Sequence, residues 1–340
     1  MTTRPANAIT SLLDFLRRLF APKTSNPPGT TFPANNLAEP ARIMTSRVLM
    51  VVYDPIMDAA SGTRLSTMMK WNRPADLVSG FIQDILRSSH GMARFQVVER
   101  LELNELPRQV DGFTYTPKNY LEVINNTLSP HTPPMADYAD ILTRLDIAPR
   151  IAKREIDEIW IFAFPYAGFY ESTMAGAGAF WCNAPPITRT ANNIRRFVVM
   201  GFSFERGVGE MLESFGHRAE SILEKTFSKS NASANLYGRF TRYDKKYPGL
   251  AEVGNIHFAP NSTRDYEWNN PRPVMSRCDD WYGFPKLTGI QRKVNASEWG
   301  NGDIRLHHNW WLNHIPHVAG RTNGVHNNWW QYIMDPNLVV

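Results

Sequence analysis

Short apolar runs alternate with segments of helical periodicity between residues 47 and 227, and this alternation constrains the fold more than any other feature. The apolar runs are rich in β-branched residues, as in strands buried on both faces. They are Arg47–Tyr53, Phe95–Leu103, Asp157–Phe164 and Arg196–Phe204. Apolar residues at helical spacing are found in Pro74–Ser89, Lys118–Asn125, Met135–Leu145 and Gly207–Phe227. The sequence therefore predicts an α/β fold with a mostly parallel sheet flanked by helices.

The remaining sequence divides the chain into further parts. The expected parts are an amphipathic segment (1–20), a Pro/Thr/Asn-rich linker (21–45), the α/β domain (46–228), and an irregular, Trp- and His-rich C-terminal subdomain packed on it (229–340). Residues 9–20 have an apolar face interrupted by Asp14, Arg17 and Arg18, unlike the unbroken apolar run of a secretory signal. This segment is expected to pack on its own domain or to dock on a partner or a membrane surface.

Composition excludes several classes of protein. The 340 residues contain only two cysteines, which argues against a disulfide scaffold and a Cys-rich zinc site. Cys182 and Cys278 are expected to be either bonded to each other or buried as free thiols. A net charge of +5 and the absence of a nucleic-acid motif argue against nucleic-acid binding. Location and oligomeric state are not predicted, although the aromatic- and Asn-rich composition slightly favours an extracellular or cell-surface protein.

The predicted helix Gly207–Phe227 has an acidic stripe opposite its apolar stripe. The acidic stripe contains Glu210, Glu213, His217, Glu220 and Glu224. One interpretation is a solvated face, or one paired with basic side chains such as Arg195 and Arg196. The other is a metal site, because Glu213 and His217 stand at i and i+4 and can meet the same ion. On this second interpretation Glu213, His217 and Glu220 are metal ligands, and Glu210 is the nearest candidate for a catalytic base.

The segment Glu213-Ser-Phe-Gly-His217 resembles the active-site helix of zincin metallopeptidases, which carries His-Glu-x-x-His. In that family the two histidines bind zinc and the glutamate activates water. Only His217 matches the pattern. Glu213 replaces the first histidine, which a metal can accept, and Ser214 replaces the general base. The resemblance implies either a divergent metal-dependent hydrolase or a relative that has lost catalysis.

Residues 303–320 contain four histidines within eleven positions, and His314 and His317 form a compact pair. They are candidates for further metal ligands, because histidine is the commonest transition-metal ligand. The alternative is that they form hydrogen bonds in an aromatic core. Trp310 and Trp329 are candidates for stacking on sugar rings, and here too the alternative is a place in the core.

The long, glycine-rich segment Pro165–Pro186 follows the third predicted strand. Sites in open α/β sheets form beyond the carboxyl ends of the strands. We therefore expect this segment to form a cleft wall, with Tyr166, Tyr170 and Glu171 as candidate substrate-binding residues. Alternatively, its small residues only allow close backbone packing.

Two functions are consistent with these patterns. The first is a metal-dependent hydrolase that uses zinc or another divalent metal on a glycan or peptide substrate, with its site on the helix 207–227. The second is a non-catalytic extracellular or surface protein that binds a glycan or an assembly partner through the Trp-rich C-terminal part.

Overall fold

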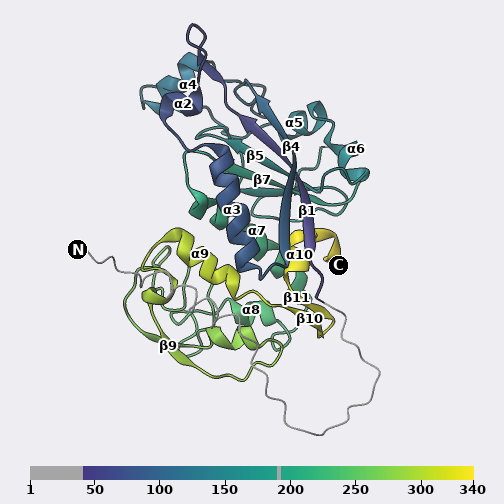
Figure 1. Ribbon diagram of the computed structural model, residues 1–340, viewed down its shortest axis with the longest axis vertical. Helices are drawn as coiled ribbons and strands as arrows, with labels where there is room; N and C mark the ends of the chain where they lie inside the picture. The colour runs from purple at the N-terminus through teal and green to yellow at the C-terminus, as the bar shows by residue number, and fades with distance from the viewer. Residues whose placement is uncertain (1–40, 190–192) are drawn as a thin grey trace, which may run out of the picture. The chain divides into compact units, whose positions relative to one another are not determined.

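A five-stranded sheet forms the centre of the computed structural model, which describes residues 41–189 and 193–340 (Figure 1). Its strand order is β4 (Ala93–Leu103), β1 (Met44–Tyr53), β5 (Glu158–Ala163), β7 (Phe197–Ser203) and β6 (Ser172–Ala175). β1 runs parallel to β4 and β5, β5 runs parallel to β7, and β6 pairs antiparallel with β7 at the edge. The predicted α/β class, with a mostly parallel sheet, is confirmed. The predicted segment 1–20 and most of the linker lie outside the described residues.

Helices α3 (Pro74–Ser88) and α7 (Val208–Phe227) cover one face of the sheet. The ring of Phe81 on α3 contacts Trp160 of β5, Phe202 of β7 and Phe215 of α7. Aromatic side chains bury large apolar areas, so this cluster fixes both helices against the sheet. Pro74 opens α3 as its first residue, where its missing N–H has no helical partner.

The side of α7 that faces the sheet also carries a buried charge, Arg218. Its guanidinium makes two bonds of 2.8 and 3.0 Å to the carboxylate of Glu158 on β5 and donates to the backbone carbonyl of Ile333. Ser46 and Trp160 donate to the same carboxylate. The ion pair therefore has its hydrogen bonds satisfied, which a buried pair requires. It fixes the rotation of α7 about its axis.

The other elements of the α/β part are short. They are β2 (Ile56–Asp58), β3 (Thr63–Arg64), α2 (Leu65–Met69), α4 (Pro117–Ile124), α5 (Tyr138–Arg144) and α6 (Ile147–Ala152). Ile141, Ile147 and Ile151 are buried, so α5 and α6 extend the core. Strand β6 lies within the segment Pro165–Pro186, for which the sequence predicts no strand, because β6 has only four residues of mixed polarity.

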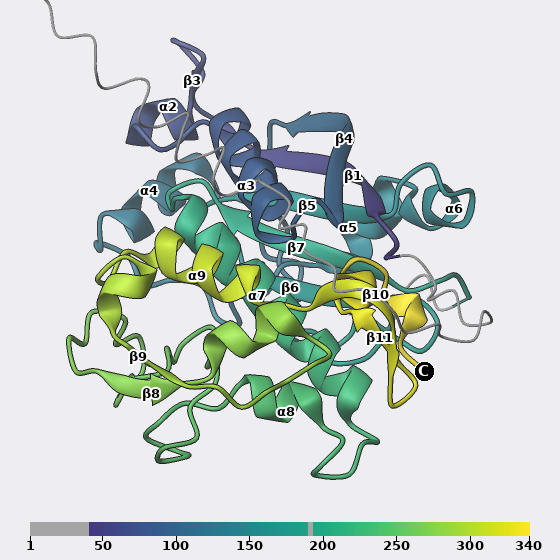
Figure 2. The same cartoon turned by 60° about the horizontal axis from the view of Figure 1, so that its bottom comes forward.

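The described residues belong to one compact unit, so the Trp-rich C-terminal residues pack with the α/β part. Figure 2 shows α7 between the sheet and these C-terminal segments. The described elements there are α8 (Leu236–Phe240), β8 (Val274–Ser276), η1 (Cys278–Gly283), β9 (Arg292–Val294), η2 (Ala296–Trp299), α9 (Ile304–Asn313), β10 (His317–Thr322), β11 (Val325–Asn328), α10 (Trp330–Met334) and η3 (Pro336–Leu338).

Helix α9 was not predicted, because its His- and Trp-rich sequence has little contrast between an apolar and a polar face. Asp303 caps its N-terminus by accepting the backbone N–H of Leu306 at 2.8 Å. Both cysteines are buried free thiols, which resolves the two alternatives left by the sequence. No helix among the described residues combines the length and apolar character needed to cross a bilayer.

Candidate metal centre

The acidic stripe of α7 supplies two members of a metal-type cluster, Glu213 and His217. Glu213 is 7% exposed and His217 and Glu220 are partly buried, so the middle of the stripe is sheltered from bulk water, whereas Glu224 at its end is exposed. Arg195 and Arg196, suggested as partners of the stripe, lie elsewhere: Arg195 pairs with Asp157 and Arg196 bonds the carbonyl of Val339. The sequence alternative of a stripe neutralised by these two arginines therefore does not hold.

The third member is His257, which lies on a tight turn between Gly254 and Phe258. Gly254 has a φ of +85°, and a Cβ there would lie 2.1 Å from the carbonyl oxygen of Phe258. On α7, a Cβ on Gly216 would lie 2.3 Å from Cδ1 of Ile256. The turn therefore requires glycine at position 254, and at position 216 a Cβ would force the Ile256 side chain to move. These two glycines bring His257 to His217, 40 residues away in the chain.

The ligand-type atoms of the cluster face one another. Nε2 of His217 and Nε2 of His257 are 3.1 Å apart, and Oε1 of Glu213 lies 3.9 and 3.4 Å from them. Two ligand atoms of a tetrahedral zinc ion, with metal–ligand distances of roughly 2.0–2.1 Å, stand about 3.3 Å apart. The three atoms can thus meet one ion without rearrangement of the backbone.

The other ring nitrogen of each histidine is held by a carboxylate. Nδ1 of His217 lies 3.0 Å from Oε2 of Glu220, and Nδ1 of His257 lies 3.1 Å from Oδ1 of Asp265. Because an ionised carboxylate only accepts hydrogen bonds, each Nδ1 carries a proton and each neutral ring turns its Nε2 lone pair inward. Oε1 of Glu220 also accepts the backbone N–H of Ile256 at 3.0 Å. Glu220, predicted as a direct ligand, instead orients both His217 and the turn that carries His257.

The cluster concentrates negative charge. Within residues 41–189 and 193–340, no lysine or arginine forms an ion pair with Glu171, Glu213, Glu220 or Asp265. Burial raises the pKa of Glu213, but contacts with His257, His308 and Tyr266 outweigh it, and the pKa is lowered. Burial lowers the pKa of His217, but Glu220, Glu171 and Glu213 outweigh that effect, and it is raised. Both shifts indicate a site that attracts positive charge.

Tyr266 completes the rim of the cluster. Its ring lies 4.3 Å from the ring of His257, and its hydroxyl interacts with Glu213. Burial and the neighbouring Glu213 raise the pKa of Tyr266 to about 12, so the hydroxyl is a proton donor at neutral pH. Its φ of +57° places a non-glycine residue in the left-handed region, a conformation that is uncommon and often found at functional sites.

A cavity of about 400 Å³ lies at the carboxyl ends of β5 and β7, and Glu171 connects its lining with the cluster, whose own three residues do not line it. Tyr166 and Glu171, two of the predicted cleft-wall residues, line it together with Ser214. Oε2 of Glu171 lies 3.9 Å from Nε2 of His217 and accepts a 2.7 Å hydrogen bond from Asn183. The third predicted residue, Tyr170, lines a different hollow and stacks near Tyr138.

Two residues on the first turns of α7, Glu210 and Ser214, form hydrogen bonds with the backbone at the start of the helix. Glu210, the predicted base, accepts the N–H of Gly207 at 3.0 Å and caps the helix, although it also lines the cavity. Ser214, at the position of the zincin base, donates to the carbonyl of Glu210 at 3.0 Å. The carboxylate nearest the cluster on the cavity side therefore comes from the β5–β6 segment, as Glu171, and not from α7.

The other predicted residues lie away from the cluster. Nδ1 of His314 donates to the carbonyl of Trp310, and the ring of His317 stacks on His90 at 3.8 Å. Trp310 packs between Trp299 and His314. The ring of Trp329 is 1% exposed in an aromatic cluster with Phe227, Phe240, Trp281 and Phe284. Trp310 and Trp329 thus pack in the C-terminal part, as the alternative given from sequence has it, whereas His314 belongs to a second group of ligand-type side chains, with Cys278 and Asp279.

His257 is the ligand-type residue that sequence reasoning missed. It is one of six histidines beyond residue 250, and no fixed spacing connects it with α7. Comparisons of the chain with protein-family models, with curated proteins and with solved structures find no match to any of them.

Proposed function

We propose that this protein is a metal-dependent hydrolase whose zinc ion is held by Glu213, His217 and His257. The observation that carries the proposal is the inward-facing pair of Nε2 atoms, 3.1 Å apart, each on a ring oriented by its own carboxylate. Two histidines and one glutamate, with a fourth position open, form a donor set typical of catalytic zinc sites. An ion at this position supplies Lewis acidity, which polarises a carbonyl group and eases deprotonation of water.

The chain's own residues would then perform the remaining steps. Glu171 stands between the cluster and the cavity, so its carboxylate can take a proton from the attacking water and return it to the leaving group. The hydroxyl of Tyr266 can donate a hydrogen bond to the oxygen on which charge develops. In the overall step, water adds to the carbonyl carbon and the bond to the leaving nitrogen or oxygen breaks. An amide or ester, such as a peptide, suits this chemistry.

The second function predicted from sequence, glycan binding through tryptophan faces, receives less support. It requires indole rings that a sugar can reach, whereas Trp329 is buried and Trp310 is sandwiched between neighbours. A glycan is therefore retained only as one class of substrate to be tested.

The proposal is tested by metal analysis and by hydrolysis of a peptide library. Wild-type protein should carry zinc at the cluster and cleave some library members. His257→Ala should lose both properties, because one of three ligands is gone. His131→Ala is the matched control, since His131 pairs with Asp111 away from the cluster.

The variant Glu171→Gln separates binding from catalysis. It should retain the metal while the rate falls by about 10²–10⁴, the usual contribution of a general base. Full activity in Glu171→Gln would remove Glu171 from the proposed chemistry. Unchanged zinc content in His257→Ala would contradict the site itself.

A further inference from the structure

A second group of ligand-type side chains lies in the C-terminal part, outside the site described above. Its members are Cys278, Asp279 and His314, whose donor atoms all lie within 4.8 Å of one another. Cys278 begins η1, and His314 is the C-cap of α9. The group thus joins two segments that lie 35 or more positions apart in the chain.

His314 gives this group a ring nitrogen that is free to bind a metal ion. The side chain is 2% exposed, and its Nδ1 donates to the backbone carbonyl of Trp310 at 2.7 Å. That bond leaves the lone pair of the neutral ring on Nε2, and Nε2 is buried without a hydrogen-bond partner. Buried polar atoms are normally paired, so an unpaired one requires an explanation. An ion bound at Nε2 provides one.

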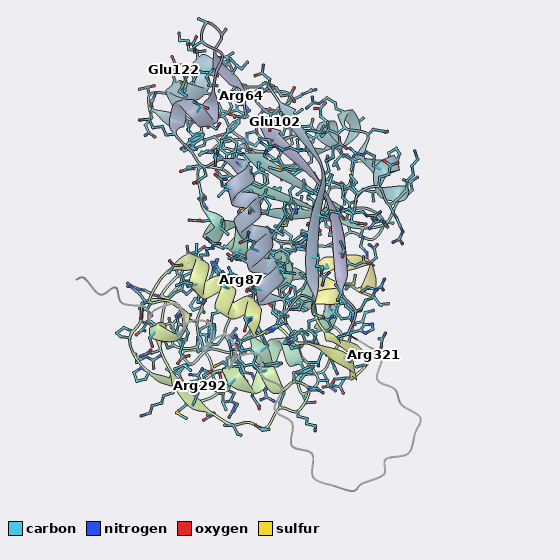
Figure 3. The ribbon with its side chains drawn as sticks, in the orientation of Figure 1. Arg64, Arg87, Glu102, Glu122, Arg292 and Arg321 are labelled. Atoms are coloured by element: carbon cyan, nitrogen blue, oxygen red, sulfur yellow. The ribbon has the colours of Figure 1, made fainter. Side chains whose placement is uncertain are left out.

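The cysteine and the aspartate are also placed for coordination. The Cys278 thiol is buried, and Sγ lies 3.5 Å from Oδ1 of Asp279. Arg292, labelled in Figure 3, binds both oxygens of the Asp279 carboxylate and also pairs with Glu298. A carboxylate has about four acceptor positions, so it can accept Arg292 and bind a metal ion at once. Arg292 then orients the carboxylate for the ion.

The surroundings resemble those of a structural rather than a catalytic site. The rings of Tyr282 and Trp310 lie 4.5 and 4.3 Å from the ring of His314 and shield it from water. The hydroxyl of Tyr282 bonds the side chain of Asn313 at 2.9 Å, so η1 and the end of α9 are already joined there. An ion would strengthen the same connection.

We infer that Cys278, Asp279 and His314 form a second, structural metal site for zinc or another thiophilic divalent cation. A thiolate, an imidazole and a carboxylate form a donor set suited to such ions. On binding, the thiol proton of Cys278 passes to solvent.

Cobalt(II) separates this site from the first one. A thiolate ligand gives a sulfur-to-cobalt charge-transfer absorption, and the cluster of Glu213, His217 and His257 contains no sulfur. The full-length protein titrated with cobalt(II) should therefore develop the thiolate band, and about two ions should bind per chain. His257→Ala should keep the band while losing one ion, so failure of the proposed function does not affect this test.

Cysteine variants identify the ligand. Cys278→Ser should abolish the thiolate band and retain about one ion, whereas Cys182→Ser, the matched control for a second buried thiol, should keep the band. His314→Gln should weaken cobalt binding at this site by at least tenfold. This variant replaces Cys278→Ser in the test if circular dichroism shows that Cys278→Ser does not fold. Absence of the band in wild-type protein, or its persistence in Cys278→Ser, would overturn the inference.

Discussion

Two histidines with their Nδ1 atoms on carboxylates and their Nε2 atoms facing each other form an arrangement that hydrogen bonding alone does not explain. Between neutral rings of this kind neither Nε2 has a proton to donate, so a hydrogen bond between His217 and His257 needs one ring to be charged, and Glu213 favours positive charge at the same point. Orientation of metal-binding histidines by a second carboxylate is a general feature of metal sites. A divalent ion satisfies both nitrogens and neutralises the carboxylate.

At this scale the sequence predicted part of the site. Helical spacing placed Glu213 and His217 on one face, because positions i and i+4 are neighbours on any helix. The same spacing made Glu220 a ligand, although its carboxylate reaches the opposite side of the His217 ring. Spacing shows which residues share a face of the helix. Whether Glu220 binds the metal ion itself or orients His217 depends instead on the turn that carries His257.

Glu220→Gln tests the orienting role of this carboxylate. The variant should bind zinc about 10–100-fold more weakly, since loss of such an indirect partner has that effect in metal sites. Affinity is measured by competition with a chelator of known zinc affinity. Glu224→Gln is the control, because Glu224 is exposed on the same helix. Equal affinity of Glu220→Gln and wild type would contradict the role assigned to Glu220.

At the scale of elements, the close approach of α7 to the turn Gly254–Phe258 depends on Gly216. Gly216→Ala should displace the turn and weaken zinc binding, and overpacking of this kind costs about 1–3 kcal/mol of unfolding free energy. Denaturant unfolding and zinc titration measure the two effects.

A second substitution checks the cause of the Gly216→Ala effect. Ile256→Ala removes the side-chain atoms that the new methyl group would meet. The double variant should therefore lose less stability than the sum of the two single variants. If the losses of unfolding free energy were strictly additive, the contact between Gly216 and Ile256 would not be what limits how closely the turn approaches α7.

Helices α3 and α9 are joined by the buried carboxylate of Asp84, which binds Arg305 and Asn309 of α9 as well as Arg87 of α3. Burial raises the pKa of Asp84, but these three partners outweigh it, and the pKa is lowered. A carboxyl whose folded pKa lies below its unfolded value stabilises the protein above the unfolded pKa of about 3.9. That stabilisation is lost as the pH falls through the folded pKa.

Asp84→Asn tests this connection. The variant should unfold at lower denaturant concentration than wild type at pH 7. The difference should shrink below about pH 4, where the carboxyl of the unfolded chain becomes protonated while the folded one, with its lowered pKa, stays ionised to lower pH. Asp76→Asn on the exposed face of α3 is the control. A difference between Asp84→Asn and wild type that is constant from pH 7 to pH 3 would contradict the account.

At the scale of the whole molecule, the α/β part could be predicted because periodicity is a local property. The predicted strand 47–53 and helix 207–227 differ from β1 and α7 by only a few residues at their ends. The C-terminal part depends instead on contacts between distant side chains and backbone. Asn261, for example, donates to the carbonyls of Asn270 and Arg272, and no repeat in the sequence encodes such bonds.

Because the cluster joins α7 to the turn that carries His257, metal binding should stabilise the whole compact unit. At a free zinc concentration about 100 times the Kd, the expected gain in unfolding free energy is about 2.7 kcal/mol. Thermal unfolding with and without zinc measures this gain. The measurement uses the Cys278→Ser variant, which lacks the second proposed metal site, so that zinc binds only at Glu213, His217 and His257. When His217→Ala is added to Cys278→Ser, zinc should no longer raise the unfolding temperature. An increase as large as that of Cys278→Ser alone would mean that zinc stabilises the protein from another site.

The most direct test of the central claim is anomalous X-ray diffraction from crystals of the full chain grown with zinc. We expect an anomalous peak about 2.0–2.2 Å from Oε1 of Glu213 and from Nε2 of both His217 and His257. Zinc-saturated crystals in which these three side chains are well ordered and no peak lies between them would contradict it.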